Sequence, residues 1–282
     1  MKGPHLNSFR KISLRVLFVL VVASMAVAVS AQKEETETDP STLHLPLMSD
    51  GEVFELTLEG TDGALLAAFN ASEGDEISIQ MISTSNVDPY LVLLGSDASI
   101  LAVDDDSGEE ALDSLIEDFE IPEDGTYFII ATTYSNRNYS FSEPSEGDGT
   151  TFNLVVEGNT EPAENNSTYT SVNMEIGESI DIDFTGEETA FFVTVIAEEG
   201  QELTFDAIPE LGIDPFLMLF DANGLRVGVD DDGGDEPLAS HLSYEVTSDG
   251  LHVALLTTFG YALVAEGDFL NSEGTIQFVI GD

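Results

Sequence analysis

Two runs of three aspartates, at 104–106 and 230–232, are the densest groups of side chains in the sequence that could bind an ion or take part in catalysis. A glutamate follows each run closely, at Glu110 and at Glu236. Carboxylates held close together repel one another unless a cation lies between them. Ca²⁺ accepts about six to eight oxygen ligands in flexible geometry, so such loops suit it well. We therefore expect two calcium sites, with these metal ligands: Asp104, Asp105, Asp106, Glu110, Asp230, Asp231, Asp232 and Glu236.

The same aspartates also have a purely structural interpretation. Aspartate side chains in loops accept hydrogen bonds from nearby backbone N–H groups and tolerate unusual dihedral angles. Repetition of the run does not discriminate, because a duplicated turn would also repeat. The spacing does not match the EF-hand loop. Asp88 and Asp214 each precede a proline, so we expect them to shape strand entry first and to bind metal second.

Residue types used by hydrolases occur beside the second run, at Asp232, Asp235, Ser240 and His241. His241 stands where the first segment has Leu115, in an alternating pattern, so we expect it to be a packing or surface residue. The sequence has no Gly-Xaa-Ser-Xaa-Gly elbow, no His-Glu-Xaa-Xaa-His motif and no phosphate loop. These features favour a protein that is not an enzyme. A secreted hydrolase with its site in one segment is the alternative.

The charge balance excludes several classes of partner. The chain has 7 Lys and Arg against 55 Asp and Glu, for a formal net charge of −48, and no Cys. Binding to nucleic acid depends on basic side chains that release counterions from phosphates, so no nucleic-acid partner is expected. The absence of cysteine excludes disulfides and thiolate metal sites. A second alternative is that the acidity is only an adaptation to salt, without specific metal binding.

The N-terminus has the pattern of an export signal. Four basic residues precede a short apolar run over 16–29, and small residues follow at 29–31. A basic start, a short apolar core and a small-residue exit are typical of a secretory signal peptide. We expect cleavage after residue 31, a secreted product that is extracellular or held at the cell envelope, and no membrane association after cleavage. An uncleaved N-terminal anchor is the alternative.

Two segments of the chain repeat one signature. Residues 88–94 and 103–108 match residues 214–220 and 229–234 at a constant offset of 126. A register kept over so many positions predicts a duplicated domain, each copy having its own core. The expected organisation is a signal peptide at 1–31, an acidic linker at 32–48, one copy at 49–157, a second linker at 158–170 and the other copy at 171–282.

Within each copy the apolar residues recur with a period of two. Ile77, Ile79 and Met81 alternate with polar residues, whereas 127–130 is continuously apolar, as in a central strand. Alternation marks strands with one buried and one solvated face. Turn residues fall regularly between these runs. The pattern predicts an all-β protein made of two tandem antiparallel β-sandwiches.

The order of these motifs resembles the bacterial pre-peptidase C-terminal domain. The resemblance rests on Asp-Pro and the apolar strand, Asp-Asp-Asp-Ser-Gly, Leu-Asp-Ser and Pro-Glu-Asp-Gly-Thr-Tyr, at 88–94, 104–108, 112–114 and 122–127. The second copy keeps the first two blocks and departs at 238–240 and 247–252. The resemblance covers most of 49–157 and, more loosely, 171–282.

The resemblance implies a jelly-roll-like sandwich with an accessory, non-catalytic role. Such domains usually follow secreted peptidases, and related domains of bacterial collagenases bind collagen and calcium. It therefore implies attachment to an extracellular protein or polysaccharide. A secreted peptidase acting in trans is a further expected partner, because the two copies and their linkers account for the chain after the signal.

Overall fold

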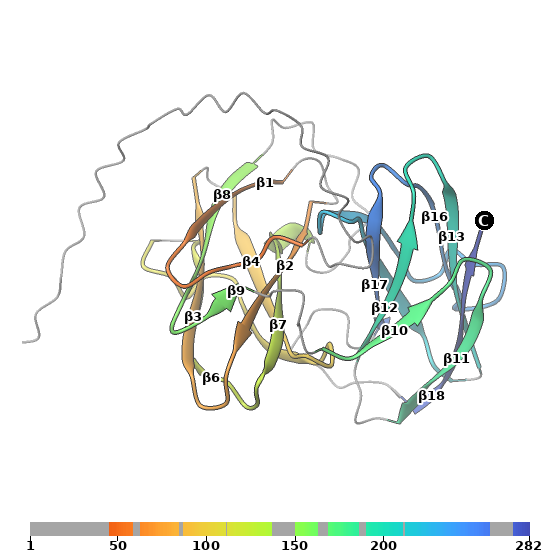
Figure 1. Cartoon of the computed structure of the whole chain (residues 1–282), viewed down its shortest axis with the longest axis horizontal. Helices are drawn as coiled ribbons and strands as arrows, with labels where there is room; N and C mark the ends of the chain where they lie inside the picture. The colour runs from red at the N-terminus through yellow and green to blue at the C-terminus, as the bar shows by residue number, and fades with distance from the viewer. Residues whose placement is uncertain are drawn as a thin grey trace, which may run out of the picture. The chain divides into compact units, whose positions relative to one another are not determined.

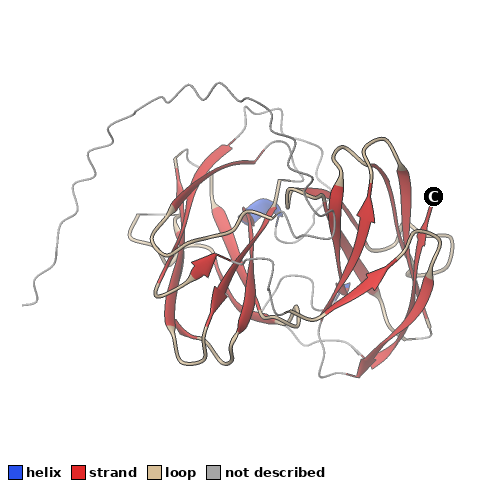
Figure 2. Cartoon of the chain, viewed as in Figure 1, coloured by secondary structure: helices blue, strands red, loops and turns tan. Residues whose placement is uncertain are grey.

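The computed structural model describes residues 45–58, 63–84, 87–110, 112–136, 150–162, 169–185, 190–210, 212–259 and 273–282. In these ranges the chain forms β-strands and one 3₁₀ turn, η1 (Tyr134–Asn136), and no α-helix (Figure 2). No helix in the described ranges could cross a membrane. The predicted signal peptide and most of the predicted acidic linker lie outside the described residues.

The first sandwich pairs a four-stranded sheet with a five-stranded sheet (Figure 1). The four-stranded sheet has the order β1 (Val53–Leu58), β8 (Thr150–Glu157), β3 (Glu76–Ser83) and β6 (Ser114–Glu120). The five-stranded sheet has the order β5 (Ile100–Asp104), β4 (Pro89–Leu94), β7 (Gly125–Thr133), β2 (Leu65–Ala71) and β9 (Glu161–Pro162). All pairings between these strands are antiparallel.

The second sandwich repeats this plan. Its four-stranded sheet has the order β11 (Ser179–Thr185), β18 (Glu273–Gly281), β13 (Glu202–Pro209) and β16 (Ser240–Glu245). Its five-stranded sheet has the order β10 (Ser171–Met174), β12 (Ala190–Ala197), β17 (Gly250–Thr258), β14 (Pro215–Phe220) and β15 (Arg226–Asp230). The edge strand β10 runs parallel to β12, whereas β9 is antiparallel to β2. The predicted all-β sandwich class is confirmed.

Each sandwich has a core between its own two sheets. In β3, Ile77, Ile79 and Met81 are buried while the residues between them are partly exposed, as the period of two predicts. The cores of the first and second sandwich are separate clusters of buried residues. Two-sheet packing of this kind is the ordinary solution for strands with one apolar face.

A third cluster joins the outer faces of the two five-stranded sheets, and we call it the shared core. The rings of Phe128 in β7 and Phe192 in β12 lie 4.6 Å apart between centroids. This contact explains why strands such as β4 and β14 are buried at every position, since both of their faces are covered. The expectation that each copy has its own core was therefore incomplete. The buried members of the shared core are Leu45, Ala64, Leu66, Ala68, Tyr90, Val92, Leu94, Ala98, Phe128, Ile130, Ala190, Phe192, Phe216, Met218, Phe220, Val253 and Leu255.

Backbone hydrogen bonds reinforce the shared core. The turn between β14 and β15 lies against the start of β2, where Leu66 N donates to Gly224 O at 2.7 Å and Arg226 N donates to Ala64 O at 3.0 Å. Gly224 has a φ of +82°, and a Cβ at this position would overlap the carbonyl oxygen of Leu66. Glycine is required here both by the left-handed backbone and by the close approach.

Candidate functional site

Both aspartate runs begin at the last residue of an edge strand and continue into a loop that leads to the four-stranded sheet. Asp104 ends β5 and Asp230 ends β15. We call residues 104–114 the first Asp loop and residues 230–240 the second Asp loop. Each loop therefore lies where the edge of one sheet passes to the edge of the other.

The first aspartate of each run has a structural role. The Asp104 carboxylate accepts hydrogen bonds from Ser107 N at 3.1 Å and Leu115 N at 2.6 Å. The Asp230 carboxylate accepts from Gly233 N at 2.7 Å and His241 N at 2.8 Å. In both loops this side chain caps the turn and fastens it to the next strand. The turn-forming interpretation therefore accounts for one oxygen of each of these two aspartates.

The far end of each loop is closed in the same way. Gly108 N donates to Asp113 O at 2.8 Å, and Gly234 N donates to Ala239 O at 2.7 Å. A Cβ on Gly108 would lie 2.5 Å from the Asp113 Cβ, so glycine is needed for the close approach. The two loops thus share one backbone design.

Ser240 is held by the backbone and is not placed as a nucleophile. The residue is fully buried, and its Oγ lies 2.9 Å from Pro215 O and 3.2 Å from Asp231 O. Its counterpart Ser114 donates to Asp105 O at 3.1 Å. Both serines tie the aspartate run to the sandwich, which gives them a structural role.

Asp214 is the most perturbed acid of the second Asp loop region. Burial, followed by the charges of Asp232 and Asp231, raises its pKa to about 6. Its Oδ1 is buried and has no hydrogen-bond partner among the described residues. Burial and the charges of Asp232 and Asp230 also raise the pKa of Asp231. Together these acids form a locus where a positive ion would relieve both desolvation and repulsion.

The donor chemistry at this locus fits a hard cation, because every candidate ligand is an oxygen. In the described ranges, however, no three His, Asp or Glu side chains already converge on one point as metal ligands.

The structure places several of the expected ligands in backbone hydrogen bonds. Asp104 and Asp230 each use one carboxylate oxygen to accept hydrogen bonds from backbone N–H groups. Glu110 and Glu236 accept turn hydrogen bonds through their carbonyl oxygens, from Asp113 N and Ala239 N, both at 3.1 Å. The sequence predicts that Asp214 shapes strand entry first and binds metal second, and the structure places it where the charges of Asp232 and Asp231 act on it.

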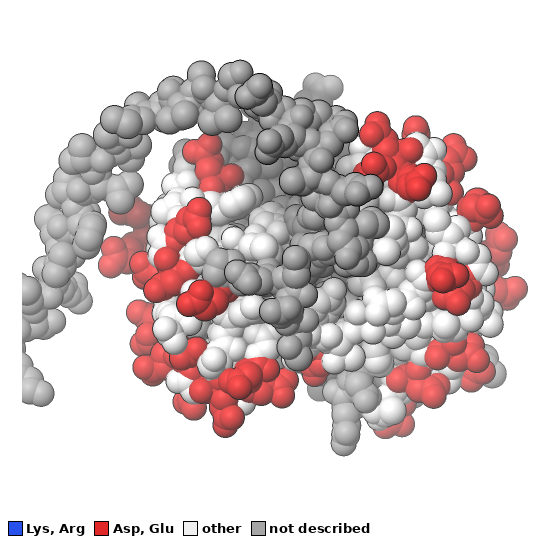
Figure 3. Space-filling model, viewed as in Figure 1, with Lys and Arg blue, Asp and Glu red and all other residues white. Residues whose placement is uncertain are grey.

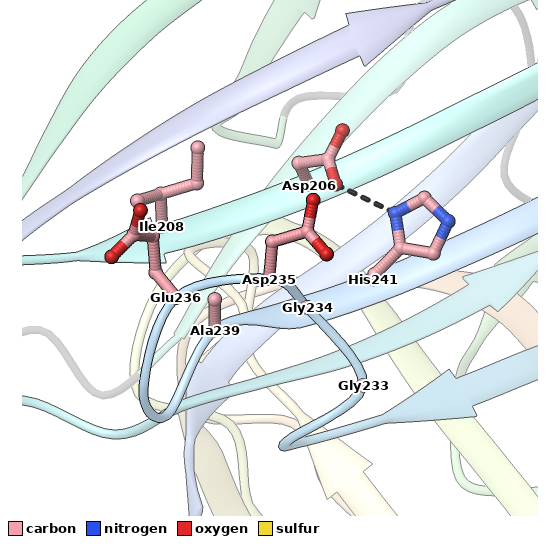
Figure 4. Close-up of a pocket in the computed structure, with 8 residues that line it drawn as sticks. All are labelled: Asp206, Ile208, Gly233, Gly234, Asp235, Glu236, Ala239 and His241. Atoms are coloured by element: carbon pink, nitrogen blue, oxygen red, sulfur yellow. Dashed lines mark hydrogen bonds and ion pairs between the residues drawn. The ribbon is translucent and has the colours of Figure 1, made fainter.

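A cavity of about 520 Å³ lies beside the second Asp loop. His241 in β16 is paired in register with Asp206 in β13, and its Nδ1 lies 2.6 Å from the Asp206 carboxylate (Figure 4). The His241 Nε2 lies 3.0 Å from Ser243 Oγ. The sequence pattern missed Asp206, because only the strand register reveals a cross-strand partner. The cavity is lined by Asp206, Ile208, Gly233, Gly234, Asp235, Glu236, Ala239 and His241.

The described part of the molecule has a strongly acidic surface. The drawn face carries many acidic side chains and shows no Lys or Arg (Figure 3). Arg226 is the single Lys or Arg in the described ranges, and it is 7% exposed. A surface of this kind favours cations and repels nucleic acid.

The comparisons with known proteins give one family match and similarity to solved structures. No curated protein sequence matches the chain. One solved structure similar to it is the pre-peptidase C-terminal domain of a collagenase from Bacillus anthracis, with 10% identity and a TM-score of 0.31, over 39% of this chain and 94% of that one. Another, from Eubacterium rectale, is described as a secreted protein, with 10% identity and a TM-score of 0.23, over 81% of this chain and 72% of that one. The family model of the bacterial pre-peptidase C-terminal domain matches residues 65–133, the segment from β2 to β7 that contains the first Asp loop.

Proposed function

We propose that this protein is a secreted, non-catalytic pair of β-sandwich modules that attaches to an extracellular protein or polysaccharide, with calcium bound at its Asp loops. The observation that carries the calcium part is the buried, unsatisfied Oδ1 of Asp214 beside Asp231 and Asp232. The family match to the first sandwich supports the accessory role.

Calcium would be held in the second Asp loop by oxygens of Asp214, Asp231 and Asp232, with Glu236 close along the chain. Ionised Asp214 lacks a donor for its buried oxygen, and a bound cation would supply the missing positive partner. The corresponding ligands in the first loop are Asp105, Asp106 and Glu110. Asp104 and Asp230 hold the two loops in shape and each keeps one oxygen for a metal.

Support for attachment comes from the loops, because binding residues are disproportionately carried on loops that a rigid sheet positions. A secreted peptidase acting in trans is the partner that the family description suggests.

The proposal is tested by calcium-dependent capture. The chain from residue 32 would be immobilised and exposed to extracellular structural proteins, polysaccharides and secreted peptidases, with calcium or with a chelator. We expect one class to be retained with calcium and released by the chelator. The double variant Asp214→Asn/Asp232→Asn should weaken retention, whereas Glu245→Gln, an exposed charge on β16, should not. Retention of nothing, or retention that ignores both calcium and the loop variant, would contradict the proposal.

A further inference from the structure

Three side chains on the outer face of the second sandwich form one hydrogen-bonded chain. Asp206 in β13 and His241 in β16 are cross-strand partners, and the Asp206 carboxylate lies 2.6 Å from the His241 Nδ1. The other ring nitrogen, Nε2, lies 3.0 Å from the Oγ of Ser243, two residues further along β16 and therefore on the same face. The order carboxylate, imidazole and hydroxyl, joined through these atoms, is that of a serine nucleophile with its general base and the acid that orients the base.

The protonation of this chain is set by the carboxylate. An ionised Asp206 can only accept a hydrogen bond, so the neutral His241 ring carries its proton on Nδ1. The lone pair of Nε2 is then left to accept the Ser243 hydroxyl proton. The side chains of His241 and Asp206 are 36% and 33% exposed, and Ser243 is exposed, so a substrate can reach the hydroxyl.

A backbone donor accompanies the hydroxyl. His241 N donates to the Asp230 carboxylate at 2.8 Å, so it points away from β13 and off the edge of the four-stranded sheet. Alternate N–H groups of an antiparallel strand point the same way, so Ser243 N is also directed off this edge. The N–H of the nucleophilic serine is one of the donors that hold the oxyanion in serine hydrolases. A single donor predicts slow turnover, because each is worth about 10²–10³ in rate.

The cavity of about 520 Å³ beside the second Asp loop adjoins this chain. Asp206 and His241 line it, and Ile208 and Ala239 give it apolar contact (Figure 4). Its volume is within the range of small-molecule sites, about 300–1,000 Å³. The acidic surface repels anionic substrates, whereas an uncharged substrate with a small alkyl group suits this space.

We propose that the second sandwich hydrolyses uncharged carboxylic esters with small acyl groups, with Ser243 as nucleophile, His241 as general base and Asp206 as the residue that positions the ring. Ser243 Oγ bonds to the ester carbonyl carbon while its proton passes to His241 Nε2. The bond from this carbon to the alcohol oxygen then breaks, and the alcohol leaves with the proton from Nε2. Water attacks the acyl-serine and gives a proton to Nε2, the bond from carbon to Oγ breaks, and Oγ takes that proton as the carboxylic acid leaves.

The first sandwich lacks all three side chains. At an offset of 126 it has Gln80, Leu115 and Glu117, and Gln80 is paired in register with Leu115 as Asp206 is with His241. We therefore assign the reaction to the second sandwich alone. The inference goes beyond the proposed function, because it restricts the non-catalytic description to the first sandwich, and it requires neither calcium nor attachment.

Covalent labelling tests the nucleophile directly. The chain from residue 32 would be treated with a fluorophosphonate in the presence of a calcium chelator, and the labelled residue would be located by peptide mass spectrometry. We expect the label on Ser243. Labelling should be about a hundredfold slower in Asp206→Gln/His241→Leu, which installs the pair that the first sandwich already accommodates, and in the chain unfolded in urea.

Hydrolysis of p-nitrophenyl acetate gives the second readout. Ser243→Ala should lower its rate about a hundredfold, whereas Glu245→Gln, an exposed charge outside the chain of hydrogen bonds, should not change it. Asp206→Asn should lower kcat with little change in KM and in the unfolding temperature, as expected of a positioning residue and not of a packing residue.

Two results would overturn the inference. The first is a label spread over the exposed serines at the rate of the unfolded chain. The second is ester hydrolysis that survives Ser243→Ala, because the imidazole alone would then account for it. Either result, together with calcium-dependent attachment, would remove this inference and leave the proposed function in place.

Discussion

The two sandwiches of this chain are alike in their frame and different in their polar chemistry. Their sheets have the same strand order except at the edge formed by β9 in the first sandwich and by β10 in the second, and both Asp loops are capped by the first aspartate and closed by a glycine. Where the first sandwich has Leu115 and Tyr127, the second has His241 and His252. The comparison teaches that the hydrogen bonds to the loop backbone are kept in both sandwiches, while the side chains beside the loop differ.

The largest expected effect concerns the shared core. Phe192→Ala should destabilise the protein by about 3–5 kcal/mol, because it removes a buried aromatic ring that contacts Phe128. Since both sandwiches contribute to this core, we expect the unfolding of both to shift to lower temperature in calorimetry. Ile196→Ala, which changes a residue 43% exposed on the same strand, is the matched control. Loss of stability in the second sandwich alone would show that the shared core does not couple the two.

The next effect concerns the backbone contact at the turn between β14 and β15. Gly224→Ala should cost about 2–4 kcal/mol, because it combines a left-handed φ with overlap on the Leu66 carbonyl. Gly51 has a φ of +68° but open space around its Cβ position, so Gly51→Ala should cost only about 1 kcal/mol. Chemical unfolding of the two variants measures the difference. Equal costs would mean that the close approach of the two sandwiches contributes nothing.

A smaller effect tests the equivalence of the two Asp loops. Asp104→Ala and Asp230→Ala should each cost about 1–2 kcal/mol, because two backbone donors lose their acceptor in each case. Asn at either position keeps an acceptor oxygen and should recover much of the loss. Urea unfolding in the presence of a chelator separates this role from metal binding. A large cost at one loop and none at the other would refute a common loop design.

The smallest effect concerns the buried residue that differs between the sandwiches. Burial lowers the pKa of His252, so the folded state binds fewer protons there than the unfolded state. Stability from this residue is complete above its unfolded pKa of about 6.5 and decreases as pH falls below it. His252→Tyr, which copies Tyr127, should reduce the loss of stability between pH 7.5 and pH 5.5, and Tyr127→His should increase it. Unfolding curves that keep the same pH dependence in both variants would contradict this assignment.

Much of the fold could be predicted from the sequence, because strand periodicity reports directly which face of a strand is buried. The alternation at Ile77, Ile79 and Met81 gave the correct strand, and the continuous run at 127–130 gave a central one. The continuous run at 127–130 indicated that both faces of this strand are covered, but not which residues cover them. The shared core could therefore be identified only from the structure. The partnership of Asp206 with His241 was equally hidden, because it depends on the register between β13 and β16.

The Asp loops illustrate a different limit. The repeated run identified where acids gather, but a capping aspartate and a metal-binding aspartate have the same letter in the sequence. The structure separates Asp230, which holds backbone N–H groups, from Asp214, whose buried oxygen has no hydrogen bond among the described residues. The sequence could not make this distinction, because desolvation depends on what packs around each carboxylate.

Isothermal titration of the chain from residue 32 with calcium tests the central claim most directly. We predict heat of binding that saturates near two calcium ions per chain in the presence of moderate sodium chloride, and near one ion for Asp214→Asn/Asp232→Asn. No heat with calcium, together with stabilisation by monovalent salt alone, would contradict the claim and leave the acidity as an adaptation to salt.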